Sequence, residues 1–381
     1  MPEMASEQIE QIDVTLIVPT YNTGKFLDQA LSSARENHVA RMEILAINDG
    51  STDDSLSIMR RHEQQDPRVR VIDKPNGGYG SACNRGLSEA RGTYVAILEP
   101  DDYVRAGFYD EMLAFAQTFP QLPDVVKTPY TRVTQPCTPK ERLYHCAYTD
   151  RLHPEHQPFT IFDHPRLLQH HPSIWSAMYR RAFLEEKGIR FKEAKGGGWV
   201  DNPFLVETLC QASSIVFLDK EFYCYREDLP GSSSMLKATG LAFERWNDMT
   251  DILDRLGVDD AGVRRAHAVR GIAYLSGIME EAGIAGSDAE REMQRMFSRM
   301  PVESMLDNPN ISNPIKALFC KVRGIEPTFD KRPYRKALVD EFAYSIHNNG
   351  LPFALSRVLL FLGRRSRINR HNPNLTSGAG I

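Results

Sequence analysis

The 381-residue sequence has no long apolar run, no excess of either charge and no closely spaced cysteines. No apolar stretch approaches the ~18 residues that a membrane-spanning helix needs. The 46 basic and 50 acidic residues leave a formal net charge of −4, and this balance gives no reason to expect a nucleic-acid partner. The six cysteines form no CxxC motif, so we expect reduced thiols rather than disulfides or a zinc site.

The N-terminus also lacks the apolar segment of a signal peptide. Its first 13 residues, MPEMASEQIEQID, are acidic. Together with the scattered cysteines, this predicts a cytoplasmic protein. We expect residues 1–12 to form a disordered tail and residues 371–381 to form a second flexible tail.

Short apolar runs alternate with segments of helical periodicity over the first 130 residues. Several runs are uninterrupted, which is typical of parallel strands covered on both faces. The expected strands are residues 14–18, 43–47, 69–72, 94–98 and 124–127. Apolar residues at i, i+3, i+4 and i+7 between the runs predict helices. We therefore expect an α/β fold with a doubly wound, mostly parallel sheet flanked by helices.

This pattern changes twice further along the chain. Residues 131–172 are rich in proline and histidine, and we interpret them as a long irregular excursion over the sheet. Their histidines are spaced too irregularly for a metal site and are expected on the loop surface. From residue 241 the periodicity is helical, so we expect a sheet-containing domain over 13–235 and a mainly helical domain over 241–370.

Polar residues follow each of the first four predicted strands. The carboxyl ends of parallel strands lie on one rim of a sheet, so these residues should lie together. They are Pro19, Thr20 and Tyr21 after the first strand, Asp49 after the second, Asn76 after the third, and Glu99, Asp101 and Asp102 after the fourth. Such a set could hold a base, a ribose and a metal-chelated diphosphate. Arg85 could reach phosphate, although an exposed helical arginine is usually only solvated.

The acidic residues after the fourth strand are the sharpest feature. Glu99, Asp101 and Asp102 place three like charges within four residues, which raises their pKa values and costs stability unless a cation compensates. A bound Mg²⁺ or Mn²⁺ would relieve the repulsion and neutralise the diphosphate of a nucleotide. Alternatively, Asp101 or Asp102 caps the helix that begins near residue 106, but capping accounts for one aspartate and not for three acids.

A competing motif keeps a second class of protein open. The segment GYGSAC, residues 78–83, nearly fits GxGxxG, which in a dinucleotide-dependent oxidoreductase cradles a pyrophosphate. The third glycine is replaced by Cys83, and the motif follows the third strand instead of opening the sheet. We therefore rank the oxidoreductase hypothesis below nucleotide and metal binding.

The polar clusters belong to four longer segments: LIVPTYNTGKFLDQALSSA, ILAINDGSTDDS, NGGYGSACNRGLSEARGTYVAILEPDDY and GGWVDNPFL. Their order and spacing resemble the family 2 inverting glycosyltransferases of the GT-A fold. The resemblance covers roughly residues 12–235 and does not reach the C-terminal helices.

The resemblance implies roles for residues at matching positions. Pro19, Thr20, Tyr21 and Asp49 would surround the nucleoside. Asp101 and Asp102 would contact the ribose and a divalent metal, with Asp102 as the more direct ligand. Asp201 would be the general base, although taken alone it reads as a helix cap before Pro203.

The implied activity moves a sugar from a nucleotide donor, with UDP favoured, to a hydroxyl of a glycan or lipid-linked acceptor. One in-line displacement would invert the anomeric centre, and the product would belong to a surface polysaccharide or glycolipid. Two departures matter: Glu99 stands where aspartate is commoner, and Val200 replaces an acidic neighbour of Asp201. They keep open a non-catalytic nucleotide-sugar binding module.

Three further features carry weaker hypotheses. Glycines 196–198 suggest a loop that closes over the donor, or simply an exposed turn. Trp199 is a candidate platform for the sugar, and Arg226 could contact phosphate or acceptor. Over residues 353–370 an apolar face precedes several arginines; such a helix can lie on an anionic membrane, or pack on the catalytic domain with its arginines in water.

Overall fold

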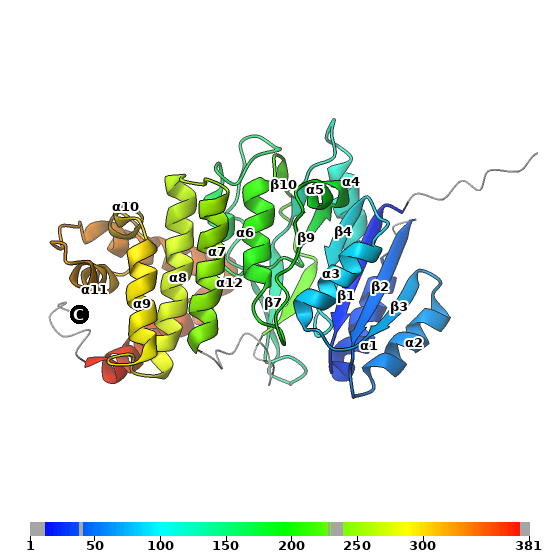
Figure 1. The fold of residues 1–381 in the computed structure, drawn as a ribbon, viewed down its shortest axis with the longest axis horizontal. Helices are drawn as coiled ribbons and strands as arrows, with labels where there is room; N and C mark the ends of the chain where they lie inside the picture. The colour runs from blue at the N-terminus through cyan, green and yellow to red at the C-terminus, as the bar shows by residue number, and fades with distance from the viewer. Residues whose placement is uncertain (1–11, 38–40, 228, 230–238, 374–381) are drawn as a thin grey trace, which may run out of the picture.

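The computed structural model describes residues 12–37, 41–227, 229 and 239–373. The predicted terminal tails therefore lie almost wholly outside the described residues, as does the expected domain boundary between 235 and 241. Figure 1 shows a sheet-containing region beside a region of helices. No described helix is long and apolar enough to cross a membrane. All six cysteines are free thiols, as predicted.

A seven-stranded sheet forms the core of the first region, in the order β10-β6-β9-β4-β1-β2-β3. Its strands are β1 (Val14–Thr20), β2 (Met42–Asp49), β3 (Val69–Lys74), β4 (Tyr94–Ile97), β6 (Val125–Lys127), β9 (Ala177–Arg180) and β10 (Ile215–Phe217). All pair in parallel except β9, which runs antiparallel between β4 and β6. Every residue of β1 and β2 is buried, which confirms the expected mostly parallel sheet and its strands.

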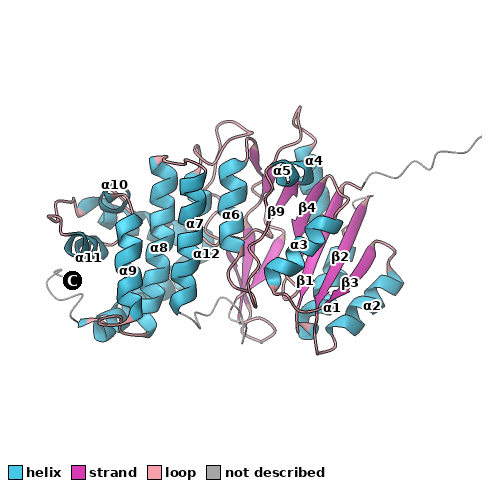
Figure 2. Ribbon diagram, in the orientation of Figure 1, coloured by secondary structure: helices cyan, strands magenta, loops and turns pink. Residues whose placement is uncertain are grey.

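Helices cover this sheet because each turns one apolar stripe toward it. They are α1 (Gly24–Arg35), α2 (Ser55–Gln65), α3 (Tyr79–Glu89), α4 (Phe108–Ala116), α5 (Arg181–Glu186) and α6 (Asp201–Gln211). The predicted stripe of α1 is fully buried at Leu27, Ala30, Leu31 and Ala34. Figure 2 shows α3 lying across the strands of the sheet.

The segment expected to be an irregular excursion contains more order than its composition suggested. A second sheet runs in the order β5-β11-β7-β8, with bounds Tyr103–Val104, Tyr223–Arg226, Tyr130–Thr134 and Arg142–His145. A short 3₁₀ helix, η1, follows at Pro165–Leu168. The rest is loop. Strands β7 and β8 form a hairpin. It was not predicted from the sequence because both strands are short and β8 is solvent-exposed, so neither shows a strong apolar pattern.

The C-terminal region is helical, as predicted. It comprises α7 (Thr239–Arg255), α8 (Ala261–Glu281), α9 (Asp288–Arg299), α10 (Val302–Leu306), α11 (Asn313–Arg323) and α12 (Arg332–His371). Helix α6 packs on α7, and buried apolar residues form one continuous cluster from β1 to α11. The two regions therefore share a core.

Helix α12 bends at Gly350, where φ is 82° and Pro352 follows. Beyond the bend, Leu355, Leu359 and Leu362 are 49%, 71% and 52% exposed. Arg364 and Arg367 instead pair with Glu280 of α8. The apolar face is thus largely exposed, while Arg364 and Arg367 pair with α8 and remain about half exposed themselves.

Close packing between α3 and the sheet depends on Gly86. A Cβ at this position would lie 2.5 Å from Cγ2 of Ile17, a fully buried residue of β1. We expect Gly86→Ala to lower the free energy of unfolding by about 1–3 kcal/mol, because the core must shift to admit the methyl group. Chemical denaturation measures this. Gly240→Ala in α7, where a Cβ meets nothing within 4 Å, is the control and should cause no loss; equal stability of the two variants would contradict the packing argument.

Candidate active site

A cavity of about 440 Å³ opens beyond the carboxyl end of β4, between the sheet region and α8. It brings together five of the predicted residues: Glu99, Asp101, Trp199, Asp201 and Arg226. They come from three separate segments, the loop after β4, the start of α6 and strand β11. Among the lining residues that sequence reasoning missed are Tyr79, His170, His171, Trp175, Tyr225, Arg270 and Tyr274.

Asp102 is held inside the protein rather than presented to the cavity. Its side chain is buried, and both carboxylate oxygens are used: Oδ1 accepts from the backbone N–H of Arg226 at 2.7 Å, and Oδ2 accepts from the Tyr223 hydroxyl at 2.9 Å. Asp101, in contrast, lines the cavity. The structure therefore favours Asp101 over Asp102 as the residue able to meet a ligand directly.

Burial sets the protonation of the acidic residues that face the cavity. It raises the pKa of Glu99 to about 8, and the neighbouring Asp101 and Asp201 carboxylates add to that rise. The Tyr79 hydroxyl donates to Glu99 Oε1 at 2.5 Å and opposes it. Burial also raises the pKa of Asp101, while Arg226 lowers it. These carboxylates are close enough to disfavour one another's charge, which is the situation that a cation relieves.

Asp201 is the first residue of α6 and lines the cavity. Burial raises its pKa, and the nearby Arg270 cation opposes the rise. The next residue, Asn202, fixes this end of the helix, because its Oδ1 accepts from Arg270 at 2.5 Å and from the Tyr274 hydroxyl at 2.7 Å. The helical region thus holds the candidate base in place through α8.

Aromatic rings form one wall of the cavity. Trp175 stacks on Tyr223 with ring centroids 4.0 Å apart and lies 5.1 Å from the Tyr225 ring. Trp199 has a positive φ of 51° and its ring lies 5.4 Å from that of Tyr274. No spacing in the sequence signals Trp175 or Tyr225, because their approach depends on how β11 crosses the loop before β9.

Two histidines expected on the loop surface lie in this cavity instead. His170 and His171 follow η1, and the backbone carbonyls of Leu168 and His170 accept hydrogen bonds from the buried Arg270. These hydrogen bonds hold the loop against α8, so the expected surface position of the two histidines was wrong. Burial, with Arg270 nearby, lowers the pKa of each imidazole to about 3.

The remaining predicted nucleoside residues form an adjacent rim and are not among the described residues that line the cavity. Asp49 is buried, and it accepts from Lys74 Nζ at 2.5 Å and from the backbone N–H of Gly78 at 2.8 Å. The Asn76 side chain donates to the backbone carbonyl of Asp49 at 2.9 Å. Tyr21 is half exposed. Pro19 and Thr20 pair with Ile47 and Asn48 at the carboxyl ends of β1 and β2.

Arg85 does not join either group. Its guanidinium pairs with Glu89 one turn further along α3, at 2.9 Å. Neither residue lines the cavity. Of the two interpretations of Arg85, a solvated arginine on a helix surface describes this position better than a contact with phosphate.

The glycine-rich turn at the start of α3 approaches protein rather than a dinucleotide. A Cβ on Gly78 would lie 2.1 Å from the carbonyl oxygen of Ala194, and one on Gly80 would lie 2.2 Å from that of Lys192. Tyr79 N–H donates to the carbonyl of Gly196 at 3.0 Å. The small residues here make room for the 192–196 segment, so the near match to GxGxxG has a structural cause.

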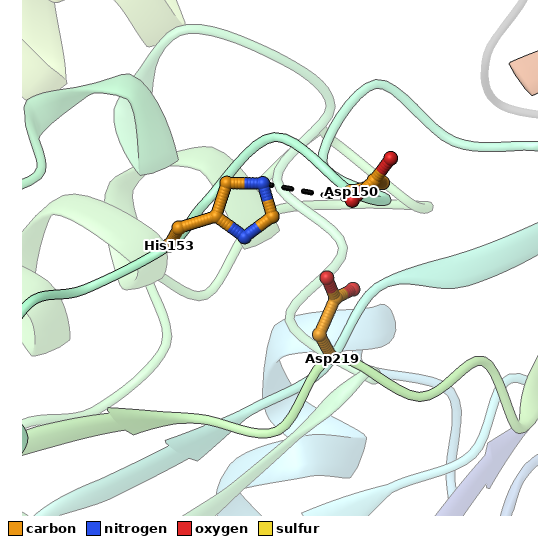
Figure 3. Close-up of side chains that lie close together, drawn as sticks. All are labelled: Asp150, His153 and Asp219. Carbon is orange, nitrogen blue, oxygen red and sulfur yellow. Dashed lines mark ion pairs between the residues drawn. The ribbon is translucent and has the colours of Figure 1, made fainter. Parts of the chain in front are cut away.

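A second group of metal-type side chains lies at the surface. Figure 3 shows Asp150, His153 and Asp219 turned toward one another, with His153 Nε2 and Asp150 Oδ1 3.6 Å apart. All three are exposed, and none lines the cavity. This cluster is separate from the metal site that the sequence predicts at Asp101 and Asp102.

The sequence of this chain is similar to those of known proteins. Residues 15–187 match the family model described as "Glycosyl transferase family 2". The chain is 30% identical to "Uncharacterized glycosyltransferase EpsJ" of Bacillus subtilis (strain 168), over 56% of this chain and 61% of that protein. It is 38% identical to "Chondroitin synthase" of Pasteurella multocida (strain Pm70), over 24% of this chain and 9% of that protein. The chain thus spans less than two thirds of either relative.

Among solved structures, S. aureus TarS 1–349 in complex with UDP-GlcNAc has the same fold, with a TM-score of 0.61 and 20% identity over 88% of this chain and 92% of that one. This likeness confirms the expected GT-A fold. Over residues 15–187 the chain matches glycosyl transferase family 2, which confirms the resemblance that its motifs predicted.

The lowered pKa values of His170 and His171 make a direct prediction. A base whose pKa falls from about 6.5 to about 3 stays neutral at pH 5. We expect the imidazole ¹⁵N shifts of both residues, assigned with His170→Gln and His171→Gln, to be those of the neutral ring at pH 5. Protonation of either ring between pH 6 and 7 would contradict this burial.

Proposed function

We propose that this protein transfers a sugar from a nucleotide-sugar donor to an acceptor hydroxyl with inversion at the anomeric carbon. The observation that carries the proposal is the cavity itself, which Asp201 lines together with Glu99 and Asp101. The names of the relatives support polysaccharide synthesis as the setting.

Asp201 is the proposed general base. An acceptor hydroxyl attacks poorly unless a carboxylate takes its proton as the new bond forms, and a base works best when its pKa lies near the working pH. Burial moves the pKa of Asp201 upward, in that direction. The acceptor oxygen forms a bond to the anomeric carbon, the bond from that carbon to the diphosphate breaks, and the hydroxyl proton passes to Asp201.

The residues present fit a divalent cation. Asp101 and Glu99 offer carboxylate oxygens, which are the ligands that Mg²⁺ and Mn²⁺ prefer, and burial raises the pKa of both in the absence of a cation. Asp101 would be the main ligand, and Asp102 would orient the loop through its hydrogen bonds with Tyr223 and Arg226. When bound, the metal supplies positive charge that stabilises the departing diphosphate.

UDP is the favoured leaving group, since TarS has been crystallised with UDP and with UDP-GlcNAc. In this assignment the rim holds the nucleoside: Tyr21 offers a half-exposed ring for stacking, Asn76 offers an exposed polar group, and the buried Asp49 positions the turn at residues 77–78. Arg226 then lies toward the diphosphate and Trp199 toward the sugar. A non-catalytic nucleotide-sugar binding module is the second candidate, favoured only by the departures at Glu99 and Val200.

Calorimetry and turnover together test this proposal. We expect UDP to bind more tightly with Mn²⁺ than with a chelator, and Asp101→Asn to lose that difference. Asp201→Asn should keep metal-dependent UDP binding but slow UDP-sugar turnover by ~10²–10⁴-fold, because it cannot accept the proton.

Glu207→Gln, on the same helix but paired with Arg255 away from the cavity, is the matched control and should behave as the wild type. Metal-independent binding of UDP, or none, would refute the donor and metal assignments. Equal turnover by wild type and Asp201→Asn would exclude Asp201 as the base, whereas UDP-sugar binding with no turnover by the wild type would leave the binding module as the better description.

The exposed apolar face of α12 supports a further part of the proposal, which is peripheral contact with an anionic membrane. Residues 351–371 contain no aspartate or glutamate, and leucines 355, 359 and 362 project from a helix that also carries five arginines. Apolar side chains beside cationic ones suit insertion into the headgroup region of an anionic bilayer.

Flotation with vesicles tests this contact. The wild type should float with phosphatidylglycerol vesicles, and the double variant Leu355→Gln, Leu359→Gln should stay in solution because it loses apolar area for insertion. Leu143→Gln on β8, which is 54% exposed but lies on another element, is the control. Equal flotation of the double variant and the wild type would exclude α12 as the membrane contact.

A further inference from the structure

A basic cavity and an apolar groove adjoin the catalytic cavity along α8. The basic cavity, of about 310 Å³, lies between the 151–169 segment, α8 and residues 308–310. The apolar groove, of about 340 Å³, lies between α8, α11 and α12. Each has a volume that a phosphate group or a short hydrocarbon segment can occupy.

Shared lining residues make the three spaces contiguous. Gln169 lines both the catalytic and the basic cavities. Val269 and Asn310 line both the basic cavity and the apolar groove. Ala273 lines both the groove and the catalytic cavity. The three spaces are therefore neighbours along α8, in the order in which an extended ligand would occupy them.

The basic cavity carries more positive charge than its neighbours neutralise. Arg151 pairs with Glu341 at 2.8 Å. Arg166 and Arg265 also line the cavity, and within the described chain neither makes an ion pair. Asp163 lies there too, and its carboxylate, which accepts from Thr160 at 2.8 and 2.9 Å, offsets one of these charges. One positive charge is left without a negative counterpart, and two guanidinium groups in one recess suit a phosphate or diphosphate, which guanidinium binds with paired hydrogen bonds.

The groove next to it is apolar and open. Ile272 and Leu318 form its buried floor, and Leu338 and Phe361, each 41% exposed, form its edges. Arg365 lies at the same opening. An exposed apolar groove of this kind marks a binding site for an apolar group, and the positive edge favours a chain that ends in an anion.

We propose that the acceptor is an amphiphile in which a sugar is joined to a hydrocarbon chain through a phosphate or diphosphate. This inference rests on the proposed function and assigns its acceptor class. The order of the cavities matches the order of parts in such a molecule: the reacting hydroxyl at Asp201, the phosphate at Arg166 and Arg265, and the chain between α8 and α12. A free glycan would use neither the two arginines nor the groove.

Binding of farnesyl diphosphate to the full-length protein tests this assignment without requiring turnover. We expect it to bind about tenfold or more tightly than either farnesol or inorganic pyrophosphate, since it fills both spaces. Arg166→Gln, Arg265→Gln should weaken the two diphosphates and spare farnesol. Leu338→Asn should weaken the two farnesyl compounds and spare pyrophosphate.

Arg295→Gln on α9 and Leu143→Asn on β8 are exposed, line none of the three spaces and serve as matched controls. Farnesyl diphosphate binding no tighter than pyrophosphate would overturn the inference, as would equal losses in the control variants. Binding of UDP with Mn²⁺ is measured on the same samples, so a failure of the donor assignment is seen separately from a failure of the acceptor assignment.

Discussion

The buried carboxylate of Asp102 is the interaction on which the catalytic cavity depends. The Tyr223 hydroxyl donates to Asp102 and accepts from the backbone N–H of Glu99, while the other oxygen of Asp102 accepts from the backbone of Arg226. These three bonds tie the loop after β4 to β11, and so join the two sheets. Asp102 is fixed by these hydrogen bonds, and Glu99 and Asp101 face the cavity. A cation bound between their carboxylates would relieve the repulsion of the two negative charges.

The second half of the site comes from the helical region. Arg270 of α8 bonds to Asn202 at the start of α6 and to the backbone of the loop that carries His170 and His171. One buried cation thereby positions the candidate base and forms a wall of the cavity. The C-terminal helices are part of the site and not an appendage to a finished sheet domain, which agrees with the continuous core of the molecule.

Helix α8 connects the catalytic cavity with the exposed part of α12. Its residues line the catalytic cavity, the basic cavity and the apolar groove, and the groove ends at the exposed part of α12. A donor in water would approach from the rim near Tyr21 and Asp49, whereas an amphiphilic acceptor would approach from the α12 side. Two substrates of opposite solubility could then meet at Asp201 without competing for one entrance.

The sequence by itself determined the strands of the parallel sheet, their helices and the acidic residues at the end of β4, because apolar period and strand-end position are local properties. It identified Asp201 only through its motif. The tertiary structure alone decided that both carboxylate oxygens of Asp102 are hydrogen-bonded while Asp101 faces the cavity, and that two loop histidines lie inside. Each of these depends on a partner a hundred or more residues away, which the local pattern of residues does not encode.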